Sequence, residues 1–199
     1  MIYNFLQIVF KNIFFTIDTN EKVVFITFDD GPNQNITQHY LNILNEYDAK
    51  ATFFCLGKNC EKHSELINKI TEHGHAVGNH SYSHLNGWNT NNFTYFKDIL
   101  NKSNVNSNLF RPPYGKISLR QLLTLKKKFK IVFWDILCND YEKDFDLEKT
   151  FLKIKNSIKN GSIIVFHDNE KSYENTKQIL PLVLDYLKSE GFKFNKLEL

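Results

Sequence analysis

The sequence predicts an α/β domain whose parallel sheet curls into an incomplete (β/α) barrel of about seven strands. Short apolar runs alternate along the chain with longer segments in which apolar residues recur at helical spacing. Several of the runs are continuously apolar, which is typical of parallel strands buried on both faces. The chain has 199 residues, fewer than the roughly 250 of a full eight-unit barrel. We therefore expect an incomplete barrel, with an open sheet as the alternative.

The expected strands are rich in β-branched and aromatic residues. The clearest is VVFITF at 23–28. Two acids follow this run, and after them comes the turn-forming pair Gly31 and Pro32. Because parallel strands are joined through helices, each run is expected to contribute one strand to the sheet. The expected strands are 23–28, 51–56, 76–77, 109–110, 131–136, 162–166 and 192–194.

Amphipathic segments between these runs are the expected helices. In the segment 36–47, Ile36, Tyr40 and Leu44 lie on one helical face. The segment 64–74 ends at Gly74, a residue typical of the position just after a helix. Pro181 predicts a kink in the last helix or a start beyond it. The remaining expected helices lie near 93–103, 118–128, 147–159 and 176–189.

Charge and cysteine content exclude several classes of protein. The 25 basic and 22 acidic residues nearly cancel, and the longest like-charge block is the triplet 126–128. So short a block does not indicate nucleic-acid binding, and no nucleic-acid partner is expected. The three cysteines have no C-x-x-C spacing, which argues against a disulfide scaffold and favours a reducing compartment.

The N-terminal segment, residues 1–22, is expected to be distinct from a single catalytic-type domain at 23–199. It is apolar but has no basic residue before the apolar part, Lys11 interrupts it, and no cleavage site follows. We expect it to pack on the domain; peripheral membrane contact through residues 1–18 is the alternative. The lack of a signal peptide favours the cytoplasm, with association with the inner membrane as the alternative. The oligomeric state is not indicated.

Reactive side chains follow the predicted strands. Because functional groups gather at the carboxyl ends of parallel strands, these positions are expected to share one site. Each strand end carries a different chemistry: an acid pair, a histidine pair, an arginine, further acids and a last histidine. The residues are Asp29, Asp30, His80, His84, Arg111, Tyr114, Asp135, Asp140, Tyr141, His167 and Asp168.

The histidine pair and the acid pair together indicate a metal site. His80 and His84 are four residues apart, and two imidazoles with one carboxylate bind a divalent ion and leave a position for water. The second acid of the pair can then act as a base on that water. Arg111 is a candidate to hold this base ionised, because its planar fork suits a carboxylate.

The motifs resemble those of the polysaccharide deacetylases of carbohydrate esterase family 4, the NodB-homology family. Four motifs occur in the family's order: TFDDGP at 27–32, HSYSH at 80–84, RPPYG at 111–115 and VFH at 165–167. The last departs from the family's L-x-H in having Val165 where the family has Leu. The resemblance spans residues 23–168 and implies a distorted, incomplete (β/α) barrel.

The resemblance also implies the reaction and the roles of five residues. It implies hydrolysis of the N-acetyl group of an amino sugar in a polymer or oligomer, with release of acetate. Asp30, His80 and His84 would hold one divalent ion, expected to be Zn²⁺ among the transition metals. Asp29 would be the general base on the metal-bound water, and His167 the general acid.

Further residues complete the implied site. Arg111 would orient the base, and the backbone N–H of Tyr114 would stabilise the tetrahedral oxyanion together with the metal. Pro113, Tyr141 and Asp140 are expected to contact the N-acetylated glycan substrate, Tyr141 as an aromatic wall.

The fourth motif departs from the family pattern. The family has D-x-x-D-W, and the aligned residues here are Leu137 to Tyr141. The resemblance assigns tuning of the catalytic histidine to the first acid, which Leu137 cannot provide. Asp135 lies two residues earlier and points to the same side of an extended strand, so we expect it to be the partner of His167. An ordinary polar residue at a strand end is the alternative.

Two other functions remain open. The altered fourth motif favours a catalytically weakened relative that binds glycans through the same groove. A related barrel could also hydrolyse amide bonds in a small nitrogenous compound, and would then release ammonia instead of acetate.

Overall fold

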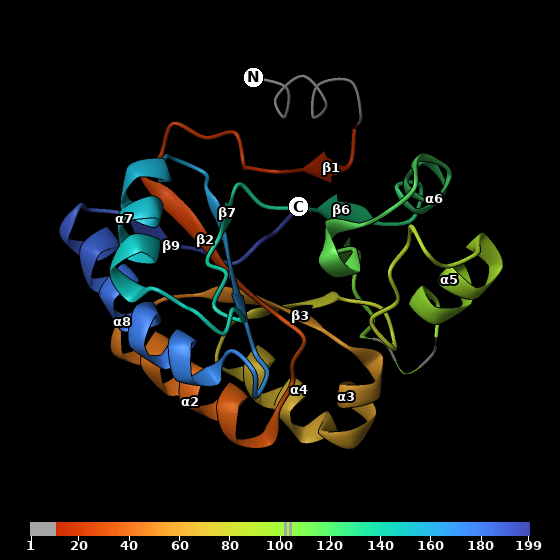
Figure 1. Cartoon of the computed structure of the whole chain (residues 1–199), viewed down its shortest axis with the longest axis horizontal. Coiled ribbons are helices and arrows are strands. Elements are labelled where there is room, and N and C mark those ends of the chain that lie inside the picture. Colours follow the sequence, from red (N-terminus) through yellow and green to blue (C-terminus); the bar gives the residue numbers. More distant parts are fainter. Residues whose placement is uncertain (1–10, 102, 104) are drawn as a thin grey trace.

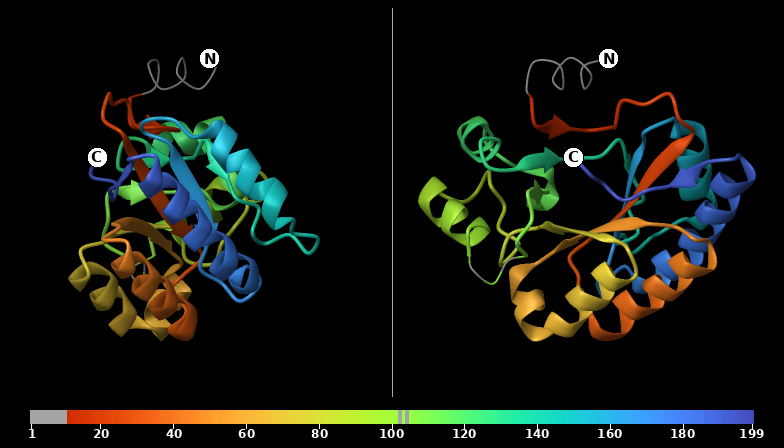
Figure 2. Two further views of the ribbon diagram at one scale, coloured as in Figure 1. Left: turned by 90° about the vertical axis from the view of Figure 1, so that its left-hand side faces the viewer. Right: turned by 180° about the vertical axis from the view of Figure 1, so that it is seen from behind.

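A computed structural model describes residues 11–101, 103 and 105–199 of the chain. The sheet consists of parallel strands in the order β1-β6-β5-β4-β3-β2-β8-β7, and β9 pairs with β2. Helices cover the outer side of this curled sheet (Figures 1 and 2). The incomplete (β/α) barrel is confirmed. The N-terminal residues 1–10 lie outside the described part, so their predicted packing or membrane contact stays a prediction.

Six strands form at the apolar runs that the sequence marks. They are β2 (Val23–Asp29), β3 (Ala51–Cys55), β4 (Ala76–Asn79), β5 (Leu109–Phe110), β8 (Ile163–His167) and β9 (Lys193–Phe194). The expected strand 131–136 is instead two strands, β6 (Lys130–Val132) and β7 (Ile136–Leu137). A further strand, β1 (Ile13–Phe14), pairs with β6.

The split of the 131–136 run explains the curl of the sheet. β6 lies near one end of the strand order and β7 forms the other end, although only three residues separate them in the chain. Such a short connection requires the two ends of the sheet to lie close together, because each residue spans at most about 3.6 Å. The sheet therefore curls, and the connecting residues 133–135 bridge its open side.

Six of the described helices lie at the predicted amphipathic segments with ends that differ by a few residues, and α3 is an additional, unpredicted helix. Gly74 has a φ of 82° just after α4, as expected of a residue that ends a helix. α8 begins before Pro181 and continues through it, so the predicted later start is wrong. The helices are α2 (Gln34–Glu46), α3 (Gly57–Lys62), α4 (Ser64–Glu72), α5 (Asn92–Ile99), α6 (Leu119–Leu125), α7 (Leu147–Ser157) and α8 (Tyr173–Ser189), with a short 3₁₀ turn, η1 (Pro113–Gly115).

Alternation of side chains along β2 decides which of them point into the barrel. Val24, Ile26 and Phe28 of β2 belong to the large apolar cluster beneath the helices. Val23 and Phe25 instead belong to a second cluster inside the curl. Because side chains alternate between faces, Asp29 continues the inward series at the carboxyl end of β2. The base expected from sequence is therefore the last inward-facing residue of the central strand.

None of the described helices is long and apolar enough to cross a lipid bilayer.

Candidate active site

Asp29 is buried and tied to a buried arginine. Its Oδ1 accepts a hydrogen bond of 2.7 Å from Nη1 of Arg111. Arg111 is fully buried, also donates to Oγ1 of Thr27 and to the carbonyl of Val132, and lies 4.1 Å from the ring centroid of Phe54. These contacts fix the guanidinium from several sides, so it holds one oxygen of Asp29 in place and leaves Oδ2 toward the pocket.

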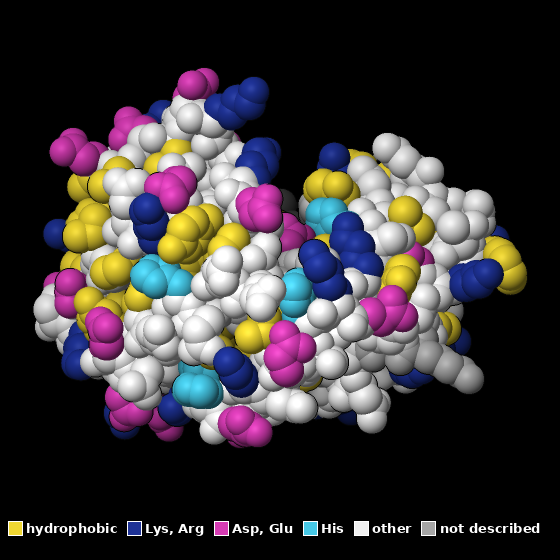
Figure 3. All heavy atoms as spheres, turned by 90° about the horizontal axis from the view of Figure 1, so that it is seen from below, with side chains coloured by type: hydrophobic (Ala, Val, Ile, Leu, Met, Phe, Trp, Pro, Cys, Tyr) yellow, Lys and Arg dark blue, Asp and Glu magenta, His cyan; other side chains and the backbone are white. Residues whose placement is uncertain are grey.

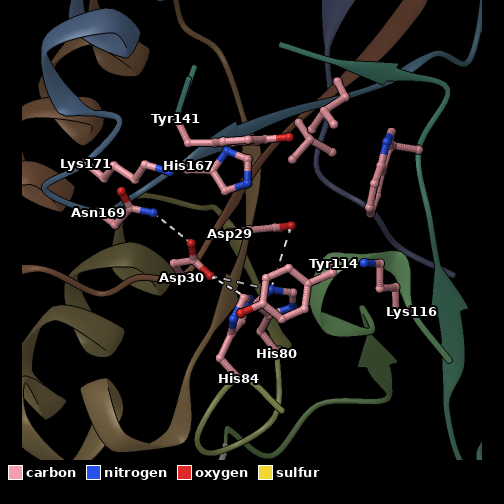
Figure 4. A pocket seen from close by; sticks show the side chains of 13 residues that line it. Asp29, Asp30, His80, His84, Tyr114, Lys116, Tyr141, His167, Asn169 and Lys171 are labelled. Atoms are coloured by element: carbon pink, nitrogen blue, oxygen red, sulfur yellow. Dashed lines mark hydrogen bonds and ion pairs between the residues drawn. The ribbon is translucent and has the colours of Figure 1, made fainter. Parts of the chain in front are cut away.

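Asp30, His80 and His84 converge next to Asp29. A φ of 78° at Asp30 turns the chain out of β2, so adjacent acids point into the same site. Oδ1 of Asp30 lies 3.6 Å from Nε2 of His80 and 3.2 Å from Nε2 of His84. One potential ligand atom from each residue lies within 4.8 Å of those of the other two (Figure 4).

The chemistry of this cluster fits a divalent cation. Nδ1 of His80 lies 2.8 Å from the carbonyl oxygen of Arg111, which can only accept, so Nδ1 carries the proton and Nε2 presents a lone pair. Burial lowers the pKa of His80 to about 3 and also lowers that of His84, which keeps both rings neutral. Oδ1 of Asp30 is buried without a donor among the described residues. A buried carboxylate oxygen facing two imidazole lone pairs is the arrangement expected around a cation.

Asn169 is a further member of the site that sequence reasoning missed. Its amide nitrogen donates a 2.7 Å hydrogen bond to Oδ2 of Asp30 and thereby leaves Oδ1 facing the histidines. Hydrogen bonds of this kind orient metal ligands. The signal was its position two residues after His167, at the same strand end.

The turn after Asp30 is built against Asp168. The backbone N–H of Asp168 donates to the carbonyl of Asp29 over 2.7 Å. A Cβ on Gly31 would lie 2.2 Å from Oδ2 of Asp168, so only glycine allows this approach. Burial raises the pKa of Asp168 to about 7. Asp168 therefore helps to shape the turn that carries Asp29 and Asp30.

His167 lines the pocket and is paired with Asp140. It is the residue of β8 in register with Asp29 of β2. Nδ1 of His167 lies 2.6 Å from Oδ1 of Asp140, and its backbone N–H donates to Oδ2 over 2.8 Å. Burial by itself lowers the pKa of His167. The hydrogen bond and charge of Asp140, together with the charges of Asp29 and Asp30, outweigh burial and raise this pKa to about 9. The ring is thus held protonated near neutral pH.

The predicted pairing of Asp135 with His167 is wrong. Asp135 accepts hydrogen bonds from Oγ of Ser162 and the backbone N–H of Ile163, at the opposite end of β8 from His167. Residues 133–135 do not continue a strand, so the alternation argument that linked positions 135 and 137 does not apply. The partner is Asp140, the second acid of the fourth motif.

The residues of the fourth motif have different positions relative to the pocket. Asp140 is fully buried and does not line the pocket, so the expectation that it contacts substrate is wrong. Thr176 donates to its Oδ2 over 2.6 Å. Leu137 lines the pocket as an apolar wall, and the Tyr141 ring packs edge-on against His167 with centroids 5.0 Å apart. Because Asp140 is present, the departure at Leu137 no longer favours a catalytically weakened relative.

Tyr114 of η1 forms one lip of the pocket. Tyr114 has a φ of 59° and an exposed ring that packs edge-on against His84, with centroids 4.4 Å apart. Its backbone N–H makes no hydrogen bond within the described chain, so it is available to a ligand. Pro113 is buried and does not line the pocket, contrary to its expected contact with substrate.

A pocket of about 460 Å³ joins these groups. Asp29, Asp30, His80, His84 and His167 form its polar base (Figure 4). Its walls include Trp134, Leu137, Tyr141 and Val165, none of which except Tyr141 was predicted as a site residue. On the surface, histidine, acidic and basic side chains gather around a hollow near the middle of one face (Figure 3). The arrangement suits a ligand that has an apolar group beside a hydrolysable bond.

Comparison with known proteins agrees with this geometry. The polysaccharide deacetylase family model matches residues 16–132. A peptidoglycan-N-acetylglucosamine deacetylase of Bacillus cereus is 30% identical over 188 residues, which cover 89% of this chain and 87% of that protein. The peptidoglycan-N-acetylmuramic acid deacetylase PdaC of Bacillus subtilis is 32% identical over 187 residues, covering 89% of this chain but 38% of that longer protein.

A solved structure supports the same assignment. The crystal structure of a peptidoglycan N-acetylglucosamine deacetylase in complex with a substituted N-oxidanyl-benzamide superposes with a TM-score of 0.88 and 30% sequence identity. The match covers 97% of this chain and 94% of that chain. With the four motifs joined in one pocket and these matches along most of its length, the chain belongs to the polysaccharide deacetylase family.

Proposed function

We propose that the protein removes acetyl groups from N-acetylated amino sugars of peptidoglycan and releases acetate. The observation that carries the proposal is the convergence of Asp29, the Asp30–His80–His84 cluster and His167 at one pocket. The peptidoglycan deacetylases that match most of the chain support this choice of glycan over a chitin-like oligomer.

We infer that Asp30, His80 and His84 hold one divalent ion. Two imidazoles and one carboxylate are a ligand set that catalytic zinc uses, so Zn²⁺ is the expected ion. Such an ion polarises a carbonyl oxygen and lowers the pKa of a nearby water. The buried, unpartnered Oδ1 of Asp30 and the neutral histidines support its binding.

Asp29 and His167 divide the proton transfers of the reaction. Oδ2 of Asp29 takes a proton from the attacking water as its oxygen forms a bond to the amide carbon. The oxyanion that develops faces the free backbone N–H of Tyr114. Nε2 of His167 then gives its proton to the amide nitrogen as the carbon–nitrogen bond breaks. The second proton of the water passes to the released amine, so acetate and the protonated amino sugar leave. Asp29 then returns its proton to solvent, and His167 regains one from solvent.

Two hydrogen bonds support the proposed roles of Asp29 and His167. Arg111 fixes Oδ1 of Asp29 through a hydrogen bond, so that the second oxygen, Oδ2, is the one free to act as the base. Asp140 keeps His167 protonated and oriented toward the pocket. A carboxylate base and a protonated histidine acid that line one pocket are typical of paired acid–base catalysis.

The test is a screen for acetate and ammonia release by the metal-supplemented protein. We expect acetate, without ammonia, from peptidoglycan strands or their N-acetylglucosamine-containing fragments. Ammonia release without acetate would instead indicate an amidohydrolase of small nitrogenous compounds. If loaded, folded protein released no acetate from any N-acetylated glycan, the proposed function would be rejected.

A further inference from the structure

Two lysines line the catalytic pocket on opposite sides of the Asp30–His80–His84 cluster. Lys171 lies in the turn after β8, and Lys116 follows η1 (Figure 4). Neither residue belongs to the four motifs or to the machinery proposed above. Their positions place one positive charge at each flank of the site where the acetylated sugar would lie.

Aromatic rings support both ammonium groups at the pocket edge. Nζ of Lys171 lies 5.2 Å from the ring centroid of Tyr141, which itself packs against His167. Nζ of Lys116 lies 5.4 Å from the ring centroid of Trp88, whose indole N–H is fixed by the carbonyl of Ile117. Cation–π contact restrains a lysine without neutralising its charge.

Neither lysine is paired with an acid in the described part of the chain. Other lysines of the protein do pair: Lys177 with Glu174 over 2.6 Å, and Lys159 with Asp135 over 3.8 Å. The acids inside the pocket are already engaged, since Asp29 accepts from Arg111 and Asp30 faces the two histidines. The two lysine charges are therefore available to a ligand.

We propose that Lys116 and Lys171 bind carboxylates carried by the glycan beside the acetylated sugar, so that the substrate is an anionic strand. This inference rests on the proposed deacetylase function and names the substrate class of the same pocket. Peptidoglycan meets the requirement, because every second sugar bears a lactyl group whose carboxyl is either free or extended by an acidic peptide stem. A neutral N-acetylglucosamine oligomer would leave both lysines without a partner.

The experiment compares acetate release from charged and neutral strands of equal length. The substrates are peptide-free peptidoglycan strands, the same strands with their lactyl carboxylates methyl-esterified, and strands that keep their stems. The variants are Lys116→Gln, Lys171→Gln and the double variant, each measured for kcat and KM at low and high salt. Lys155→Gln is the matched control. Nζ of Lys155 makes the same kind of cation–π contact, 5.0 Å from the ring centroid of Tyr186 on α8, but neither residue lines the pocket.

The lysines are expected to act on KM and to depend on salt. Each single variant should raise KM for a carboxylate-bearing strand about 2- to 5-fold, as expected for a partly exposed ion pair, with little change in kcat. High salt should weaken this preference, because it screens exposed charges. The methyl ester should bind wild type and variants alike, and Lys155→Gln should resemble wild type. An effect on peptide-free strands assigns the lactyl carboxylate, whereas one confined to stem-bearing strands assigns the stem.

Different results would reject the inference and the proposed function. Equal KM values for the acid, its ester and the stem-bearing strand in wild type, or equal effects of the variants on all three, would overturn the role of the lysines while leaving deacetylation intact. An effect of Lys155→Gln as large as that of the pocket variants would also overturn it. Absence of acetate from every strand, charged or neutral, would reject the deacetylase function itself.

Discussion

Replacing Asp140 by Asn tests how the pocket keeps its acid protonated. The substitution keeps the shape of the side chain but removes the charge that faces Nδ1 of His167 over 2.6 Å. Burial of His167 by itself lowers the pKa of the ring, so without Asp140 this pKa should fall from about 9 to its ordinary value of 6.5 or below. The imidazole of His167 would then lose its proton already near neutral pH.

The size of the effect follows from the two pKa values. At about pH 8, a ring with a pKa of about 9 is about nine-tenths protonated, whereas one at 6.5 is only about 3% protonated. In the proposed mechanism His167 must carry its proton to release the amine, so activity should decline as pH rises through this pKa. We therefore expect kcat/KM of Asp140→Asn to be roughly 30-fold lower than wild type at about pH 8, with a smaller loss at lower pH.

The assay is the pH profile of acetate release. The alkaline limb should move to lower pH in Asp140→Asn. Asp135→Asn is the matched control, because Asp135 contacts Ser162 and Ile163 and leaves His167 untouched. Its alkaline limb should coincide with that of wild type. An unmoved limb in Asp140→Asn, or an equal shift in Asp135→Asn, would refute the pairing as the source of the acid's protonation.

Two further substitutions test the hydrogen-bond partners of Asp29, the proposed base, and of Asp30, a proposed metal ligand. Arg111→Met leaves the buried carboxylate of Asp29 without its partner and should lower the free energy of unfolding by about 3–5 kcal/mol. The control Arg120→Met, at an exposed position, should change it by less than about 0.5 kcal/mol. Denaturant titration measures both variants. Equal stabilities would contradict the burial of that pair. Asn169→Ala removes the donor to Oδ2 of Asp30 and should weaken Zn²⁺ affinity about 10- to 100-fold in a chelator competition, an effect that the neighbouring exposed substitution Glu170→Gln should not show.

The sequence predicts the strand-end chemistry well for a physical reason. Parallel strands end at one edge of the sheet, so reactive side chains that follow different strands meet there. This rule brings Asp30, His80, His84 and His167 to one pocket from three strand ends. The inward direction of Asp29 follows from alternation along β2, and the left-handed φ of Asp30 then directs the next side chain into the same site.

The sequence fails where the backbone leaves regular structure. The run 131–136 has the composition of one strand, but it divides into β6, next to the first strand of the order, and β7, the last strand. Alternation counted through such a break assigns Asp135 to the wrong side, and Asn139, with a φ of 56°, redirects the chain again before Asp140. Neither conformation has a strong local signal in the residues themselves.

The other unpredicted features depend on tertiary contacts. β1 forms because Ile13 and Phe14 pair with β6, a contact between residues more than a hundred positions apart. Trp134, Lys116 and Lys171 reach the pocket from loops whose course is set by the curl of the sheet. No periodicity marks such positions, so their role becomes visible only in three dimensions.

The most direct test of the division of labour between the adjacent acids is to measure bound metal and acetate release together in Asp29→Asn and His84→Ala. The proposed roles predict that Asp29→Asn keeps one tightly bound divalent ion but loses turnover, by about 10²-fold or more. They predict that His84→Ala loses the ion and the activity together. Normal turnover by Asp29→Asn, or a fully loaded and active His84→Ala, would contradict the assignment of Asp29 as base and of Asp30, His80 and His84 as metal ligands.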